Sequence, residues 1–235
     1  MLSRIAFVLI SSLAVPAFAG PEAGSGSSPT APAKTGPGTA VVKQANETIA
    51  SLLKQKAAPG SDAEKTQAKK VTESVRSFLN IDELGRAAMV NQWSKLTPAQ
   101  QAEFLKVLRD LIEANYINGL RANLAYTVAY VGEGANKAGQ AVVNTKITAQ
   151  RKGRPYTIAI DYVLVKDLTG LRAFDIVTDG VGLVENYRQM FDKIITDKGF
   201  PALIEKMKKK LDTINASPPP APGSVAPVPA AAAKG

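Results

Sequence analysis

The side chains of this 235-residue sequence that could perform chemistry are carboxylates, lysines, arginines and tyrosines, because the chain contains neither histidine nor cysteine. That absence excludes Ser-His-Asp and Cys-His nucleophile pairs, the usual zinc ligand sets, disulfides and redox-active thiols. Two carboxylate pairs, Asp82/Glu83 and Asp175/Asp179, have the residue types that a glycosidase uses. Such residues more often cap helices and form turns, and we favour that structural interpretation.

Basic side chains outnumber acidic ones by 29 to 20, which gives a formal net charge of +9. Gathered on one face, such charges attract phosphate groups or an anionic membrane surface. An ordinary solvated surface is the alternative, and for any single lysine it is the interpretation we favour. Nucleic acid is disfavoured as a partner, because no aromatic platform accompanies the charges. The clusters concerned are Lys206, Lys208, Lys209 and Lys210, and Arg151, Lys152 and Arg154.

Tyr187 and Arg188 are the sharper candidates for ligand binding. Tyr187 falls on the apolar side of its expected helix, so we expect it to be buried with its hydroxyl group hydrogen-bonded. Arg188 can hold a phosphate group in bidentate fashion, or it can pair with Asp175 or Asp179. We slightly favour the structural pairing, because the dipeptide follows a strand end where a helix needs capping.

Both ends of the chain have compositions that do not favour a packed core. Residues 1–19 combine an early positive charge, an apolar run and a small-x-small ending, Ala17-Phe18-Ala19, as in a signal peptide cleaved near Ala19/Gly20. We therefore expect export to the periplasm, although a retained membrane anchor is the alternative. Residues 20–40 are rich in Gly, Ser, Pro and Thr, and residues 216–235 in Pro and Ala, so we expect a disordered linker and a disordered tail.

The domain expected between them, residues 41–215, shows helical spacing, then strands, then helices again. The best-marked helix start is Thr97-Pro98-Ala99-Gln100, which offers an N-cap, a proline at the first helical position and a capping-box glutamine. The helix that follows is apolar over more than half its circumference, so it must be buried on two sides or line something. Helices are expected over 41–56, 62–79, 82–89, 98–120, 183–196 and 201–214.

Four runs rich in β-branched and aromatic residues show a period of two and are separated at hairpin lengths. In the second run one face is apolar and the other is mostly polar, as in an antiparallel meander that is covered on one side. The predicted fold class is therefore α+β, with a small four-stranded antiparallel sheet and about six to seven helices packed on one side. The strands are expected over 126–131, 141–150, 156–165 and 171–178.

Three stretches of this sequence resemble the MlaC family of periplasmic phospholipid-binding proteins, also called toluene-tolerance auxiliary proteins. They are FLNIDELGRAA at 78–88 followed by Trp93, LTPAQQAEF at 96–104, and FDIV at 174–177 followed by GVGLVENYR at 180–188 and Phe191. The third stretch is the most specific, because it is long and its spacing is fixed. With the strands between them, the stretches span nearly all of residues 41–214.

Two positions depart from the family pattern. The family usually has Ser where Gly182 stands, at the expected N-cap of the following helix, and Gly is a tolerable N-cap. It also tends to place Trp before the strand that contains Phe174, where this chain has Leu171. Both differences concern local stability.

The resemblance implies a non-enzymatic carrier without cofactor or metal, whose cargo is a phospholipid. The partners it implies are an outer-membrane lipoprotein complex (MlaA-like) and an MCE-domain subunit (MlaD-like) of an inner-membrane ABC transporter, in a system that maintains outer-membrane lipid asymmetry. The acyl chains would lie in an apolar cavity enclosed by the sheet and the helices, with Arg188 as a possible head-group contact. The expected cavity wall consists of Leu108, Ile112, Tyr116, Val143, Ile147, Ile158, Ile160, Tyr162, Leu164, Phe174, Val184, Tyr187 and Phe191.

An aliphatic interior is also what a plain packed core looks like, and composition alone favours that plain core. Two other classes stay open: an exported enzyme on a small α+β scaffold, and a structural or interaction subunit of the envelope that binds no lipid. A cavity with a titratable pair of strongly shifted pKa values would favour the enzyme. A dry aliphatic cavity would favour the carrier, and a core without a cavity would favour the subunit.

Overall fold

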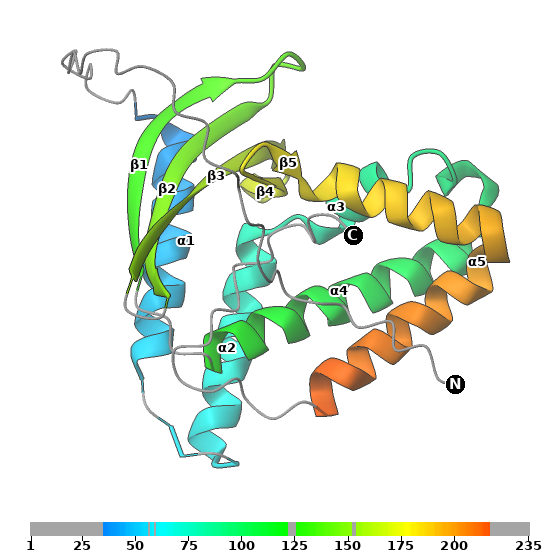
Figure 1. Ribbon diagram of the computed structural model, residues 1–235, viewed down its shortest axis with the longest axis horizontal. Coiled ribbons are helices and arrows are strands. Elements are labelled where there is room, and N and C mark those ends of the chain that lie inside the picture. Colours follow the sequence, from blue (N-terminus) through cyan, green and yellow to red (C-terminus); the bar gives the residue numbers. More distant parts are fainter. Residues whose placement is uncertain (1–34, 56, 59, 122–125, 152–153, 217–235) are drawn as a thin grey trace, which may run out of the picture. The chain divides into compact units, whose positions relative to one another are not determined.

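Three helices precede the long helix α4, a sheet follows it, and a long kinked helix closes the fold (Figure 1). The computed structural model describes residues 35–55, 57, 58, 60–121, 126–151 and 154–216. The proposed signal peptide and the proline-rich tail therefore lie outside the described residues. The helices are α1 (Pro37–Lys54), α2 (Asp62–Phe78), α3 (Ile81–Ala88), a short 3-10 helix η1 (Trp93–Lys95), α4 (Pro98–Arg121) and α5 (Leu183–Ala216).

The sheet is an antiparallel meander with the strand order β1-β2-β3-β4-β5. The α+β class and the antiparallel sheet are confirmed, but the prediction of four strands is wrong. The fifth strand is two residues long, too short for its alternation to be recognised in the sequence. The first strand also runs past the predicted end, through a register shift between Tyr130 and Gly132. The strands are β1 (Tyr126–Ala135), β2 (Ala141–Arg151), β3 (Arg154–Asp167), β4 (Gly170–Thr178) and β5 (Val181–Gly182).

The number of helices also differs from the prediction of six to seven, since the described part of the chain holds five α-helices and η1. The two helices expected over 183–196 and 201–214 are both present, joined end to end as the element α5, and they are separated where predicted, at Gly199, where φ is 82° and ψ is 166°. Helix α1 begins at Pro37, so residues 37–40 belong to the fold rather than to the predicted linker. Pro37 suits the first turn of a helix, because the N–H group that proline lacks would have no hydrogen-bond partner within the helix there.

Side-chain caps mark the helix starts that the sequence indicates. The predicted capping box is present: the Gln100 amide donates to Thr97 Oγ1 at 3.3 Å, and the Thr97 amide donates to Gln100 Oε1 at 2.9 Å. Asn80 caps α3 by accepting the Glu83 amide at 3.0 Å, and Ser61 caps α2. These local signals explain why helix starts were easier to predict than the end of β1.

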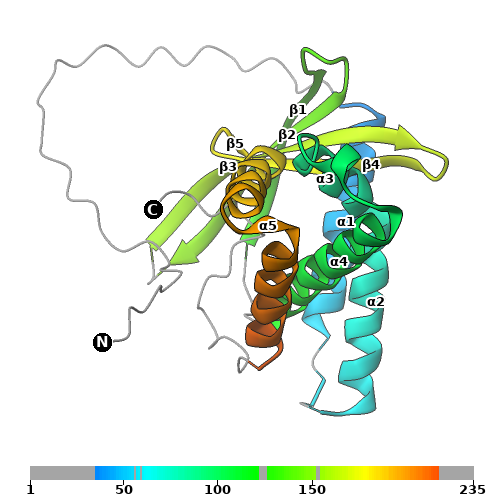
Figure 2. The same ribbon diagram turned by 90° about the vertical axis from the view of Figure 1, so that its right-hand side faces the viewer.

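The helices meet the sheet in two places. Helix α1 packs mainly on β1 and β2 and also reaches β4, whereas α2, α3 and the start of α5 pack against β4 (Figure 2). Helix α4 packs against α5, which turns back at Gly199, and Lys208 of the returning half bonds Glu103 of α4 at 2.7 Å. The inward face of the sheet carries the buried residues Val143 and Ile160, as their alternation predicts.

Glu133 of β1 fixes the position of α1. Its carboxylate accepts hydrogen bonds from the Thr39 amide at 2.7 Å, the Thr39 hydroxyl at 2.8 Å and the Gly38 amide at 3.1 Å. Burial raises the pKa of Glu133, but the hydrogen bonds from Thr39, Gly38 and Gly36 outweigh it, so the pKa lies below its ordinary value. A Cβ at Gly36 or Gly38 would lie within 3 Å of the carboxylate, which is why glycine occupies both positions.

We predict that Glu133→Gln lowers the free energy of unfolding by about 1–2 kcal/mol at pH 7, because an amide offers one acceptor to several donors. The folded-state pKa lies below the unfolded one, so the carboxylate stabilises the protein above the unfolded pKa. This contribution is lost as the pH falls through the folded pKa.

Denaturant unfolding of wild type and variant between pH 2 and pH 8 measures the difference. Glu47→Gln is the control, since Glu47 is exposed and its ion pair with Lys43, at 3.9 Å, lies on the surface. If the free energies of unfolding of wild type and Glu133→Gln still differed by the same amount at low pH, this account of how Glu133 anchors α1 would be contradicted.

Candidate functional site

Part of the inward face of the sheet is apolar but only half covered. Val128 of β1, Ile147 of β2 and Ile158 of β3 form one cross-strand row. Ile147 in the middle is buried, whereas Val128 and Ile158 on either side are half-buried and pack against the core. Tyr126 and Tyr130 flank Val128 on the same face and are also half-buried. An apolar surface left partly open in this way is available to an apolar ligand.

The helices contribute half-buried apolar side chains to the same core. Leu111 of α4 and Tyr187, Ile194 and Ile195 of α5 are half-buried and pack against it. Aliphatic and aromatic side chains of this kind suit flexible hydrocarbon chains. The hollow between α1 and α2 is a wide, open groove lined by Thr48, Leu52, Lys70, Glu73, Ser74 and Ser77, so it does not enclose a ligand.

The residues that the sequence assigned to a cavity wall divide into two groups in the structure. Nine are buried in the packed core, and Val143 among them has 0% exposure. Ile158, Phe174 and Tyr187 are half-buried, and the side chain of Tyr116 lies outside the described residues. The buried group consists of Leu108, Ile112, Val143, Ile147, Ile160, Tyr162, Leu164, Val184 and Phe191.

Tyr187 packs within its own helix α5, whereas Arg188 connects α5 to α3. The Tyr187 ring stacks on Phe191 at 5.3 Å, and burial raises the pKa of Tyr187 to about 12. We expected its hydroxyl group to be hydrogen-bonded, but within the described part of the chain this group has no hydrogen-bond partner. Arg188 donates hydrogen bonds to Glu185 at 2.8 Å and to the Ala87 carbonyl at 3.2 Å, and it acts on Asp175 through its charge, which opposes the rise that burial causes in the pKa of that carboxyl, without a hydrogen bond to it. A head-group contact by Arg188 stays a prediction.

Asp175 of β4 caps helix α5. Its Oδ1 accepts the Val184 amide at 3.0 Å and the Ile176 amide at 2.8 Å. Burial raises the pKa of Asp175, and the hydrogen bonds from Val184, Ile176 and Leu183 offset this only in part. Gly182 precedes α5 as expected, but a Cβ there would lie 3.0 Å from Asp175 Oδ2. Glycine at 182 therefore leaves room for a cap that comes from another strand.

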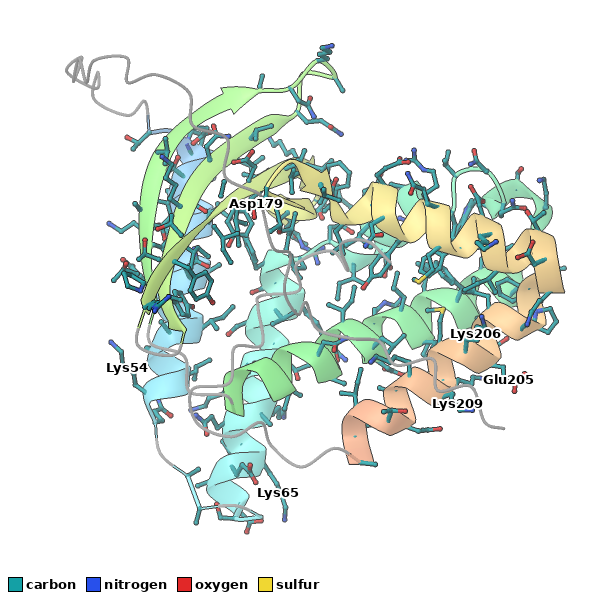
Figure 3. The ribbon with its side chains drawn as sticks, in the orientation of Figure 1. Lys54, Lys65, Asp179, Glu205, Lys206 and Lys209 are labelled. Carbon is teal, nitrogen blue, oxygen red and sulfur yellow. The ribbon has the colours of Figure 1, made fainter. Side chains whose placement is uncertain are left out.

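The other carboxylates singled out in the sequence also have structural roles. Asp82 bonds the guanidinium of Arg109 at 2.7 Å, which joins α3 to α4. Asp179 adopts a positive φ of 46° in the β4–β5 turn and accepts the Ala159 amide at 3.1 Å (Figure 3). The structural interpretation of these pairs thus has geometric support. No cluster of metal-ligating side chains occurs within the ranges that the structure describes.

The lysines near the end of the chain lie on the second half of α5, where Figure 3 shows Lys206 and Lys209. Lys208 is engaged with Glu103, as described above. Arg154 lies on the sheet, at the start of β3, so the two basic clusters belong to different elements. The side chain of Arg151 and the whole of Lys152 lie outside the described residues. Within those residues, no helix is both long and apolar enough to cross a bilayer.

A polar cluster that sequence reasoning missed lies under the half-covered face. Asn46 Nδ2 of α1 donates to the Tyr130 hydroxyl at 3.2 Å, and the same amide interacts with the Tyr162 hydroxyl. Burial raises the pKa of Tyr126, Tyr130 and Tyr162, and the phenol groups of Tyr126 and Tyr130 raise that of Tyr162 further. The alternation of β1 placed Tyr126 and Tyr130 on one face, but only the tertiary structure brings them to Asn46.

A model of the MlaC protein family matches residues 43–209. Among solved structures, the chain is similar to the phospholipid-binding protein from Ralstonia solanacearum in complex with a phospholipid. The two chains share 23% sequence identity with a TM-score of 0.61, and the match covers 75% of this chain and 97% of the other. At this identity the likeness shows a common fold. No curated protein sequence matches the chain.

We predict that Asp175→Ala destabilises the protein by about 1–3 kcal/mol, because it leaves the first amides of α5 without their buried acceptor. Thermal or urea unfolding monitored by circular dichroism measures the loss. Asp161→Ala on the neighbouring strand β3 is the matched control and should change stability by less than about 0.5 kcal/mol. Equal effects of the two substitutions would mean that the Asp175 cap contributes nothing special.

Proposed function

The chain belongs to the MlaC protein family, and from this membership we propose that it is a periplasmic phospholipid carrier and not an enzyme. The single observation that supports the proposal most directly is the half-covered apolar face formed by Val128, Ile158 and their neighbours. The fold shared with a protein that was solved with bound phospholipid agrees with it.

A carrier of this kind is needed because lipid does not cross water alone at a useful rate. Transfer of one CH₂ group from water to an apolar site is worth about 0.8 kcal/mol, so two long acyl chains represent on the order of 20 kcal/mol. A protein must offer hydrocarbon-like surface of comparable extent. In this proposal the acyl chains lie between the sheet and helices α4 and α5, and the head group faces solvent.

The proposed wall begins at the half-buried residues and extends to the buried ones when lipid enters. Val128, Ile158 and Tyr187 would contact the acyl chains without rearrangement, because they are only partly covered. The core residues Val143 and Ile147 would contact them only if a helix moved away from the sheet. We propose the kink of α5 at Gly199 as a point where such movement occurs, since its backbone is already non-helical.

We further propose that the carrier moves phospholipid between an outer-membrane lipoprotein complex (MlaA-like) and an MCE-domain subunit (MlaD-like) of an inner-membrane ABC transporter. This assignment of partners, and of a role in outer-membrane lipid asymmetry, rests on family membership alone. The structural contacts of Asp82, Asp175 and Asp179 favour a carrier over a glycosidase, because these carboxylates cap or pair.

Mass spectrometry of organic extracts from the purified chain tests the proposal. We expect phospholipid in near-stoichiometric amount after expression with export to the periplasm. An extract without phospholipid, together with no uptake of phospholipid from vesicles, would overturn the carrier and favour a packed structural subunit.

Two substitutions locate the cargo. We predict that Val128→Trp and Ile158→Trp each reduce co-purified phospholipid severalfold while the melting temperature changes by only a few degrees, because the half-covered face has room for a larger ring. Ala159→Trp is the matched control on the exposed face of β3 and should leave the lipid content unchanged.

Val143→Trp makes the complementary comparison. Val143 is completely buried, so we expect overpacking to cost about 1–3 kcal/mol and to lower the melting temperature by roughly 3–10 °C. Equal lipid contents in wild type and in both half-buried variants would show that the cargo does not lie on this face.

A further inference from the structure

The cluster of Asn46, Tyr126, Tyr130 and Tyr162 places polar groups in surroundings that are otherwise apolar. Tyr126 and Tyr130 lie on either side of Val128, on the face to which we assign the acyl chains. Tyr162 is buried, and its ring meets Phe78 edge to face at 5.6 Å. Polar groups in such a place normally have hydrogen-bond partners, because leaving them unpaired costs free energy.

The hydrogen-bond pattern leaves two donors open. Asn46 donates to the Tyr130 oxygen, so this oxygen is the acceptor and the Tyr130 hydroxyl hydrogen is still available. Within the described ranges, neither the Tyr130 hydroxyl nor the Tyr126 hydroxyl donates to any protein acceptor. The cluster can therefore give two hydrogen bonds to a ligand that lies along β1.

The electrostatic surroundings indicate which ligand atoms these donors suit. Burial raises the pKa of both tyrosines, so they stay neutral donors at any physiological pH. The charged group that acts on Tyr130 is the carboxylate of Glu47, and none of the lysines and arginines whose side chains the structure describes acts on the cluster. Among these described side chains a phosphate group would meet a repelling carboxylate and no cation, whereas an uncharged carbonyl oxygen meets neither difficulty.

We propose that Tyr126 and Tyr130, of which Asn46 holds Tyr130 in place, are the subsite that hydrogen-bonds the ester carbonyl oxygens of the lipid, where the acyl chains join the glycerol. This inference rests on the proposed function and adds to it. The subsite fixes how far the lipid enters, because the ester groups are the boundary between hydrocarbon and head group. It also makes recognition independent of the head group.

The test compares a diester phospholipid with the diether lipid that has the same chains and head group but no carbonyl oxygens. Binding to the purified, delipidated chain is measured by displacement of a fluorescent fatty-acyl probe. We expect wild type to bind the diester about tenfold more tightly, because one to two neutral hydrogen bonds separate the ligands. In Tyr126→Phe/Tyr130→Phe the preference should fall below about twofold, since the rings keep their packing and lose only the donors.

Thr148→Val is the control, because it removes a hydroxyl from the opposite face of β2, where Thr148 bonds Thr157 at 3.0 Å. It should keep the full preference for the diester. If the double variant does not fold, each single variant is used and should lower the preference about threefold.

Equal binding of diester and diether by wild type would overturn the subsite and leave the carrier function intact. It would indicate that the protein recognises the phosphate group instead of the ester carbonyl groups. A diester preference that survives in the double variant would overturn the subsite as well. Failure of wild type to bind either lipid would overturn the proposed function itself.

Discussion

Strand β4 is the joint between the two halves of this fold, and the positions of the other elements follow from how it is held. Arg172 reaches from β4 to the carbonyl groups of Arg76 and Leu79 at the end of α2, both at 2.6 Å. The Asn80 amide donates to the Ala173 carbonyl at 2.7 Å, which attaches the start of α3 to the same strand. Asp175 then caps α5. Three helices are thereby fixed to one strand by hydrogen bonds.

Anchoring the helices at β4 leaves the opposite part of the sheet without a complete cover. Helix α1 covers only the part of β1 and β2 that lies directly beneath it. Glu133 fixes the position of this helix by accepting a hydrogen bond from Thr39. The inward side chains beyond the covered part, such as Val128 and Ile158, are consequently half-buried. A fold that only needed stability would gain by covering this face, because each buried apolar side chain contributes about 1.5–3 kcal/mol. In the proposed carrier, this lost stability is the cost of a face that can bind and release an apolar ligand.

The same anchoring brings polar groups into the apolar interior. Because α1 is fixed at its first turn, Asn46 in its third turn reaches the hydroxyl of Tyr130. The hydroxyls of Tyr126 and Tyr162 lie close enough to interact with this cluster. Neutral donors can mark a position along an apolar surface without the desolvation cost of a charge. The interior therefore combines an apolar surface, which does not distinguish one hydrocarbon chain from another, with a small cluster of hydroxyl groups that can donate hydrogen bonds to one kind of polar group.

The sequence by itself determined the α+β class, the antiparallel meander, the family and most helix starts, because these depend on residues that are close along the chain. The Thr97/Gln100 capping box and the alternation around Val143 are examples. Alternation also assigned Val143 and Ile158 to the apolar face of the sheet, but it could not tell which of them would be covered. That depends on where α1 and α5 lie across the sheet, and their positions are set by contacts between residues as distant in sequence as Glu133 and Thr39. For the same reason, only the tertiary structure gave Arg188 the partners Glu185 and Ala87 and brought Asn46 to the tyrosines.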